Sequence, residues 1–171
     1  DRLASLGRTR VVDCKGYYDI LGVDPDAELY ETVVDGFENA LIEDPRLTPD
    51  TRDAFAGHED RLAWDKPVTG VDSLADLPVE PTHVNVKPSR FGSVESLLET
   101  IEYCADNEIV LYGGGQFELD VGRDHIQTLA ATFYPDAPND VAPGGYNLPD
   151  LPPNLPGSPL VPSAAPQGLD F

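Results

Sequence analysis

The sequence contains little lysine and cysteine and no methionine. Its 171 residues include no Met, two Cys and three Lys. Cys14 and Cys104 are too few and too far apart for a disulfide framework or a zinc-binding pattern, so we expect two reduced thiols within a folded core. Because even the first residue is not methionine, we expect the chain to begin inside a longer protein.

Long hydrophobic runs and an excess of positive charge are absent too. No apolar run approaches the roughly 20 residues of a membrane span. The chain has 31 acidic residues against 11 Lys and Arg, a net charge of −20. Such a surface repels nucleic acid and anionic membranes, so we expect neither as a partner. The acidic composition resembles that of proteins from high-salt cytoplasms, and we expect a cytoplasmic location.

Short apolar strands alternate with helix-like segments, and 40% of the residues are hydrophobic, which argues for a folded domain. The predicted strands are 9–15, 39–44, 61–65, 83–87, 108–113 and 139–142; the predicted helices are 26–37, 47–58, 93–107 and 122–133, with a helical turn at 71–77. Repeated strand–helix units predict an α/β fold with about six parallel strands and helices outside them, of barrel or doubly wound type.

The composition changes after about residue 143. The stretch "PGGYNLPDLPPNLPGSPLVPSAAP" is rich in proline, which can form neither the interior of a helix nor a central strand. The sequence therefore predicts a folded domain at 1–146 and a proline-rich tail at 147–171.

Charged residues stand where the predicted strands end. Asp13, Glu43, Asp65 and Lys87 end four of them, and in a parallel sheet those ends meet on one side. Three carboxylates suit Mg²⁺, and a lysine whose pKa is lowered by burial and by the metal could act as a base. Ion pairing without a metal, such as Asp13 with Lys15, explains the same spacing equally well.

Five motifs in this order resemble the C-terminal barrel domain of the enolase superfamily, on the mandelate racemase and muconate lactonizing enzyme side. They are "VVDCKG", "ALIEDP", "LAWDKP", "VNVKPSRFGS" and "YGGGQFELDVGR", and the resemblance covers residues 9 to about 146. It implies part of an eight-stranded TIM-type barrel, because the family's first two strands and its capping domain have no counterpart in this sequence. A barrel open at two sheet edges is expected to associate, for example as a homo-oligomer.

The resemblance also implies a reaction and its cofactor. One Mg²⁺ would be bound by Asp13, Glu43 and Asp65 and would hold a small carboxylate-bearing substrate. Lys87 would remove the proton α to that carboxylate and give an enediolate, as enolase-superfamily sites do with a Lys or His base. Elimination, racemization or cycloisomerization would follow, in a lyase or isomerase.

Three further residues are candidates for the site. Lys15 stands where the family often has Asn, and at the period of a strand its side chain points the same way as that of Asp13. It is a candidate second acid or base, and it would also compete with Mg²⁺ for carboxylates. Glu118, in the seventh-strand motif, and Arg90, in a loop at the same rim, are candidates for binding substrate, although ion pairing is the simpler role for Arg90.

Two other functions remain open on the sequence. One is a non-catalytic barrel remnant that binds an anion or a partner subunit. The other is an unrelated Mg²⁺-dependent barrel enzyme, such as an aldolase in which Lys87 forms a Schiff base.

Overall fold

In the computed structural model of this chain, residues 9–18, 24–116, 118–119, 121–141 and 148–155 are described. In these residues one sheet of five parallel strands forms, in the order β1-β2-β3-β4-β5. The strands are β1 (Val11–Asp13), β2 (Leu41–Glu43), β3 (Leu62–Trp64), β4 (His83–Val86) and β5 (Val110–Gly113). Each strand pairs with the next one in the chain, as in a barrel, whereas a doubly wound sheet reverses its strand order. The predicted partial barrel is therefore confirmed.

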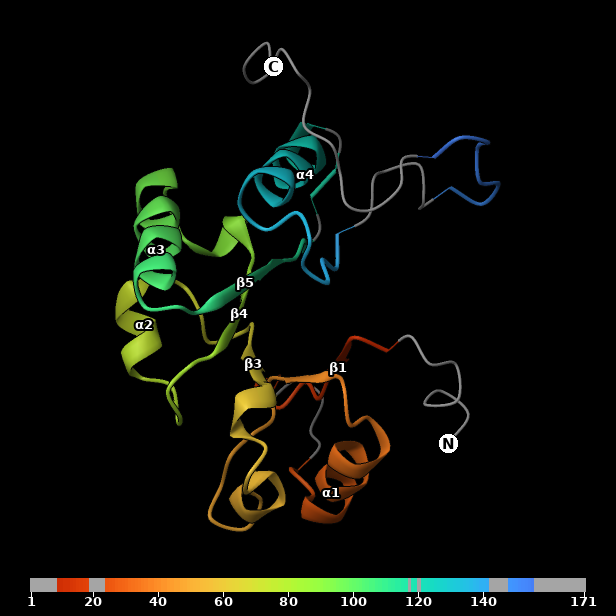
Figure 1. Cartoon of the computed structure of the whole chain (residues 1–171). Coiled ribbons are helices and arrows are strands. Elements are labelled where there is room, and N and C mark those ends of the chain that lie inside the picture. The colour runs from red at the N-terminus through yellow and green to blue at the C-terminus, as the bar shows by residue number, and fades with distance from the viewer. Residues whose placement is uncertain (1–8, 19–23, 117, 120, 142–147, 156–171) are drawn as a thin grey trace.

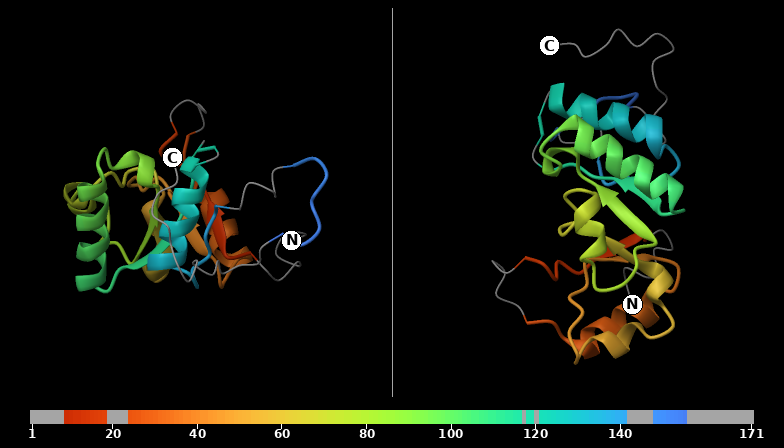
Figure 2. Two further views of the ribbon diagram at one scale, coloured as in Figure 1. Left: turned by 90° about the horizontal axis from the view of Figure 1, so that it is seen from above. Right: turned by 90° about the vertical axis from the view of Figure 1, so that its left-hand side faces the viewer.

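The helices lie around the outside of the arc of strands (Figures 1 and 2). They are α1 (Ala27–Gly36), α2 (Val71–Ala75), α3 (Val94–Asp106) and α4 (Val121–Phe133). The core lies between helices and sheet, where Ile42, Trp64 and Val84 are fully buried. Alternate residues of a strand point to opposite faces of the sheet. The residues directly before and after Ile42, Trp64 and Val84 therefore point to the inner side of the arc.

The longest well-capped helix, α3, shows why the predicted pattern holds. The Ser93 hydroxyl accepts a hydrogen bond from the Ser96 N–H at 3.1 Å and so satisfies one free donor of the first turn. Leu97, Ile101 and Cys104 are buried at spacings of four and three residues, which places them on one face of the helix.

The predicted helix at 47–58 is wrong. The segment instead contains a 3₁₀ turn, η3 (Arg52–Phe55), and a second turn, η4 (Glu59–Arg61), follows it. The Thr51 hydroxyl donates to the Arg46 carbonyl at 2.7 Å and accepts from the Thr48 N–H at 2.9 Å. These local side-chain hydrogen bonds offer the backbone an alternative to an α-helix.

The predicted last strand, 139–142, does not form over residues 139–141, and residue 142 lies outside the described residues. The segment nevertheless lies beside β5. The Asp140 N–H donates to the Gly113 carbonyl at 2.8 Å, and the Asn139 side chain accepts from the Gly113 N–H at 2.7 Å.

The predicted division into 1–146 and 147–171 stays a prediction, because the boundary falls outside the described residues. Residues 148–155 contain neither helix nor strand, in keeping with their prolines. Within the described part of the chain, no helix has the length and apolarity needed to cross a membrane.

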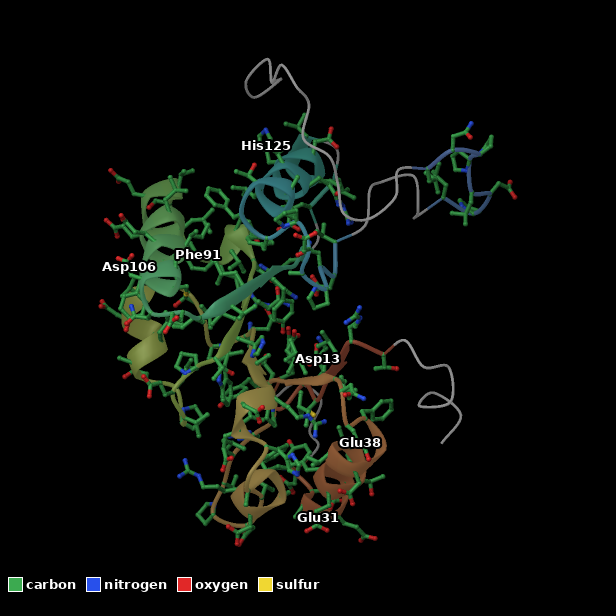
Figure 3. The ribbon with its side chains drawn as sticks, viewed as in Figure 1. Asp13, Glu31, Glu38, Phe91, Asp106 and His125 are labelled. Carbon is green, nitrogen blue, oxygen red and sulfur yellow. The ribbon has the colours of Figure 1, made fainter. Side chains whose placement is uncertain are left out.

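Most of the acidic residues that the structure shows on helices face the solvent. Glu31 lies exposed on α1, and Glu38 lies exposed just after the end of that helix (Figure 3). Asp106 lies exposed at the end of α3, also on the outer surface (Figure 3). Asp13 instead lies at the end of β1, toward the inner side of the arc (Figure 3). The outer acidic surface and the acidic strand ends are therefore separate features.

Candidate active site

The strand register brings the three predicted carboxylates to one end of the sheet. Asp13 lies opposite Glu43, and Glu43 lies opposite Ala63, two residues before Asp65. The period of a strand then directs all three side chains to the inner face, away from the helices. The charges of Asp65 and Asp13 both contribute to raising the pKa of Glu43, as expected of neighbours.

Glu43 is almost fully buried and is held by two neutral donors. Its Oε2 accepts hydrogen bonds from Asn85 Nδ2 at 3.1 Å and from the Tyr112 hydroxyl. Burial raises the pKa of Glu43 to about 8, and the negative charge of Asp65 adds to this rise, while the two hydrogen bonds oppose it. Burial therefore favours the protonated form of the Glu43 carboxyl group.

Asp65 has no exposed surface and is paired with two cations. Arg90 Nη1 and Nη2 lie 2.6 and 3.4 Å from its two oxygens, a two-point contact that suits a guanidinium. Lys87 Nζ lies 3.2 Å from Asp65 Oδ2. Arg90 belongs to the short 3₁₀ turn η5 (Pro88–Arg90), which follows β4 directly and brings both cations to the same carboxylate.

Lys87 is 7% exposed and lies between two carboxylates. Its Nζ is 3.5 Å from Asp140 Oδ2. Asp65 follows β3 and Asp140 lies beside β5, so the two carboxylates approach Lys87 from opposite sides of β4. Burial lowers the pKa of Lys87, but the charges of Asp140, Asp65 and Glu43 outweigh burial and raise that pKa above its ordinary value. The sequence led us to expect a lowered pKa; in the absence of a metal charge, the carboxylates reverse the direction.

Lys15 occupies both oxygens of Asp13. The Lys15 N–H donates to Asp13 Oδ1 at 2.9 Å, and Lys15 Nζ forms an ion pair with Asp13 Oδ2. Burial lowers the pKa of Lys15, but its hydrogen bond and charge interaction with Asp13 raise it overall. Lys15 has φ of 54°, in the left-handed region that few non-glycine residues adopt. The ion pairing that the sequence offered as an alternative is present here.

The three carboxylates suit a divalent cation by their oxygen chemistry and their strand register, but they do not form a metal site as they stand. Among the described residues, no group of three or more His, Cys, Asp or Glu side chains is arranged to hold a metal ion. Asp13 is bound by Lys15, Asp65 by Lys87 and Arg90, and Glu43 by neutral donors. Metal binding by these residues requires that those contacts open.

Glu118 lies in the loop after β5. Its Oε2 accepts a hydrogen bond from the Gln116 N–H at 2.6 Å, and Gln116 Nε2 donates to Ser89 Oγ at 2.8 Å. Burial alone raises the pKa of Glu118, but hydrogen bonds, first that with Ser89, lower it overall. Glu118 thus contacts η5, the turn to which Arg90 belongs, and substrate binding by either residue stays a prediction.

Four buried or contacting residues were missed by the sequence prediction. Asn85 and Tyr112 bind Glu43, Asp140 contacts Lys87, and Asp44 binds the end of β3. Strand periodicity could have identified Asn85, which lies two residues before Lys87 and on its face. No local signal identifies Asp140, whose contact depends on the path of the chain after α4.

Asp44 fixes the geometry of two strand ends. Its side chain accepts hydrogen bonds from the Asp65 and Lys66 N–H groups, each at 2.8 Å. Burial raises the pKa of Asp44 to about 6 in spite of these hydrogen bonds. This fully buried side chain holds the end of β3 against β2, which places Glu43 and Asp65 beside each other.

The family is settled by a match over most of the chain. Residues 1–148 match the family model DUF8230_C, "Domain of unknown function (DUF8230) C-terminal domain". The chain belongs to this family. The matched range runs from before Asp13 to beyond Asp140, so it contains every site residue described above.

Relatives with curated names or solved structures belong to the enolase superfamily or resemble its members. The o-succinylbenzoate synthase of Listeria innocua serovar 6a is 32% identical over 123 residues, covering 64% of this chain and 30% of that protein. A solved enolase-superfamily member from Listeria innocua is 25% identical with a TM-score of 0.53, covering 71% of this chain and 33% of that one.

A second solved structure, described as an unknown member of the enolase superfamily from Enterococcus faecalis, has a TM-score of 0.55 at 21% identity. It covers 78% of this chain and 36% of that one, and at this identity it supports the fold alone. The chain spans about a third of the length of these relatives. The resemblance to the enolase superfamily barrel is confirmed.

Proposed function

We propose that this chain supplies the catalytic strand ends of an enolase-superfamily enzyme that removes the proton α to a substrate carboxylate. The observation that carries the proposal is the position of Lys87. Its amine is nearly buried on the inner face of the sheet, at the same end as Glu43 and Asp65, where a parallel barrel has its active site.

In this proposal Lys87 acts as the base. The α C–H bond breaks, the proton moves to the neutral amine of Lys87, and the electron pair stays on the substrate as an enediolate. Because the surrounding carboxylates keep Lys87 as an ammonium, it must first lose a proton. Lys15, which follows β1, is proposed as the second acid or base.

We further propose that Mg²⁺ binds to Asp13, Glu43 and Asp65 once their present contacts open. A bound Mg²⁺ would supply positive charge beside the substrate carboxylate. The same charge would replace that of Lys15 at Asp13 and that of Lys87 at Asp65, which frees both lysines for proton transfer. Glu118 and Arg90 are proposed to bind the remaining polar groups of the substrate.

The curated relative supplies a candidate product. Its name is o-succinylbenzoate synthase, and formation of o-succinylbenzoate by elimination, a lyase reaction, is the specific form of the proposal. Racemization and cycloisomerization begin with the same proton abstraction, so Lys87 has the same role in each.

The experiment uses the full-length natural protein with Mg²⁺ in ²H₂O and a panel of carboxylates that carry an α C–H. Loss of an α-proton NMR signal reports abstraction. Lys87→Ala and Lys87→Arg should both abolish exchange, since arginine stays protonated at any usable pH. Lys66→Ala is the matched control, because Lys66 is exposed at the end of β3. Exchange that survives in Lys87→Ala would show that the base is another residue.

A non-catalytic barrel is the second candidate, and one observation favours it. Asp13 and Asp65 are already neutralised by lysine and arginine side chains, so these strand ends are satisfied without a metal or substrate. Under this alternative, wild-type protein shows no exchange on any compound of the panel, and Lys87→Ala lowers the melting temperature only.

A further inference from the structure

The segment after α4 brings a carboxylate to Lys87 that none of the sequence motifs contains. Asp140 is anchored through its backbone, because its N–H donates to the Gly113 carbonyl at 2.8 Å. The neighbouring Asn139 side chain accepts from the Gly113 N–H at 2.7 Å and donates to the Tyr134 carbonyl at 3.0 Å. These three hydrogen bonds connect the segment to the edge of β5 and to the end of α4, and so fix where the Asp140 side chain starts.

The Asp140 carboxylate contacts Asn85 on the inner face of β4 and Lys87, the residue directly after β4. Its Oδ2 lies 3.5 Å from Lys87 Nζ and accepts a hydrogen bond from Asn85 Nδ2 at 3.4 Å. The same Asn85 nitrogen donates to Glu43. One amide therefore connects a proposed metal ligand to the partner of the proposed base.

The glycine that directly follows β5, Gly114, leaves the space in which these groups meet. A Cβ added at Gly114 would lie 2.3 Å from Asp140 Oδ1, 2.6 Å from Asn85 Oδ1 and 2.6 Å from Lys87 Cε. All three distances are shorter than real carbon contacts allow. A side chain at residue 114 would thus force at least one of these three groups to move, so the glycine leaves room for their contact.

Lys87 therefore has one carboxylate partner on each side, and the two differ in what else they do. Asp65 also binds Arg90 and is a proposed metal ligand. Among the described residues, the Asp140 side chain forms hydrogen bonds and ion pairs only with Asn85 and Lys87, and it is 45% exposed. If a cation takes Asp65, Asp140 is the carboxylate that remains beside the lysine.

We infer that Asp140 is a positioning residue for Lys87: it holds the amine at the inner end of β4 when Asp65 is engaged elsewhere. The reason for holding the amine rests on the proposed function, whereas the contact between Asp140 and Lys87 does not depend on it. Asn85 supports the same arrangement, because its side-chain nitrogen donates one hydrogen bond to the Asp140 carboxylate and another to Glu43.

The test measures how firmly the Lys87 side chain is held, without any substrate. The full-length protein is labelled with ¹³C at the lysine ε-carbon, and the Lys87 signal is assigned by its loss in Lys87→Arg. A fixed side chain gives different shifts for its two ε-protons, whereas a rotating one gives a single averaged shift. In the wild type we expect two shifts, both without metal and with Mg²⁺ as the only added ligand.

With Mg²⁺ present, Asp140→Asn should merge the two shifts, and Asp140→Glu should keep them apart because it restores the charge. Asp136→Asn is the matched control, since Asp136 is an exposed carboxylate of the same loop. Equal melting temperatures for the Asn variants exclude unfolding as the cause. Two separate shifts in Asp140→Asn with Mg²⁺ present, or a single shift in the wild type, would overturn the inference.

The result is separable from the proposed reaction. If Asp140→Asn merges the shifts but Lys87→Ala keeps α-proton exchange, the positioning contact stands and the proposed base is wrong. If the shifts stay apart in Asp140→Asn while Lys87→Ala loses exchange, the reaction stands and Asp65 alone positions the lysine.

Discussion

Asp65 and Arg90 form a two-point ion pair in which the carboxylate has no exposed surface and the Arg90 side chain is 9% exposed. Arg90 Nη2 also lies 3.5 Å from the Tyr18 hydroxyl, so the guanidinium connects the end of β3 to the segment after β1. The residues are 25 positions apart, and η5 brings them together. We expect this pair to stabilise the strand ends and to compete with the proposed metal for Asp65.

Arg90→Met should destabilise the chain strongly. The methionine keeps the apolar part of the side chain but leaves the buried Asp65 charge with Lys87 alone, and loss of one partner of a buried pair costs about 3–5 kcal/mol. Urea unfolding gives the free energy. Arg52→Met, which removes an arginine that donates to the Pro78 carbonyl at an exposed site, should change stability far less.

The companion variant Arg90→Met/Asp65→Asn distinguishes the charge from the packing. Removal of the carboxylate charge should recover part of the lost stability, because no uncompensated ion is left in the core. If the double variant is as unstable as the sum of the two single variants, the ion pair is not the source of the effect.

The stability of the metal-free chain should fall as the pH rises from about 5 to 9. The folded-state pKa of Glu43 is raised to about 8 by burial, above its value in the unfolded chain, so the folded state binds more protons in this range. The resulting stabilisation is complete below the unfolded pKa and is lost as the pH passes through about 8. Asp44, raised to about 6, acts in the same direction at lower pH.

Glu43→Gln provides the check. Glutamine resembles the protonated carboxyl and cannot ionise, so the variant should lose most of the pH dependence between about 7 and 9 and should be more stable than the wild type at pH 9. Urea midpoints measured in a chelator supply the comparison. Equal slopes in the two proteins would show that Glu43 already ionises near its ordinary pKa.

Lys15→Asn should strengthen Mg²⁺ binding to the full-length protein. Lys15 occupies both oxygens of Asp13, and a metal must displace its ammonium. Since the lysine side chain is 45% exposed, its ion pair opposes the metal only modestly, and we expect about a two- to fivefold gain in affinity.

Calorimetric titration with MgCl₂ measures that gain. Lys66→Asn removes one positive charge from the end of β3 without touching a carboxylate contact of the site, so it controls for net charge. A similar gain in both variants would assign the effect to general electrostatics. An unchanged affinity in Lys15→Asn would mean that Asp13 is not a metal ligand.

The sequence predicts the strand ends well because the required information is local. Apolar runs followed directly by Asp13, Glu43, Asp65 and Lys87 identify four strands and their polar ends. Parallel pairing, which the alternating helices demand, then brings those ends to one side. The 3₁₀ turn in place of the 47–58 helix was missed because the Thr51 hydroxyl bonds backbone groups that an α-helix would use. The spacing of apolar residues along the sequence contains no information about such hydrogen bonds.

What the sequence by itself determined is five of the strands with most of the helices between them, their parallel order and the side of the sheet on which charge gathers, since periodicity and strand ends are properties of neighbouring residues. The tertiary structure alone decided which charges pair. Arg90 turns toward Asp65, Lys15 folds back on Asp13, and Asp140 reaches Lys87 from 53 positions away. These contacts depend on distances of a few ångströms between chain segments, and electrostatic energies and pKa values change steeply over such distances in a buried site.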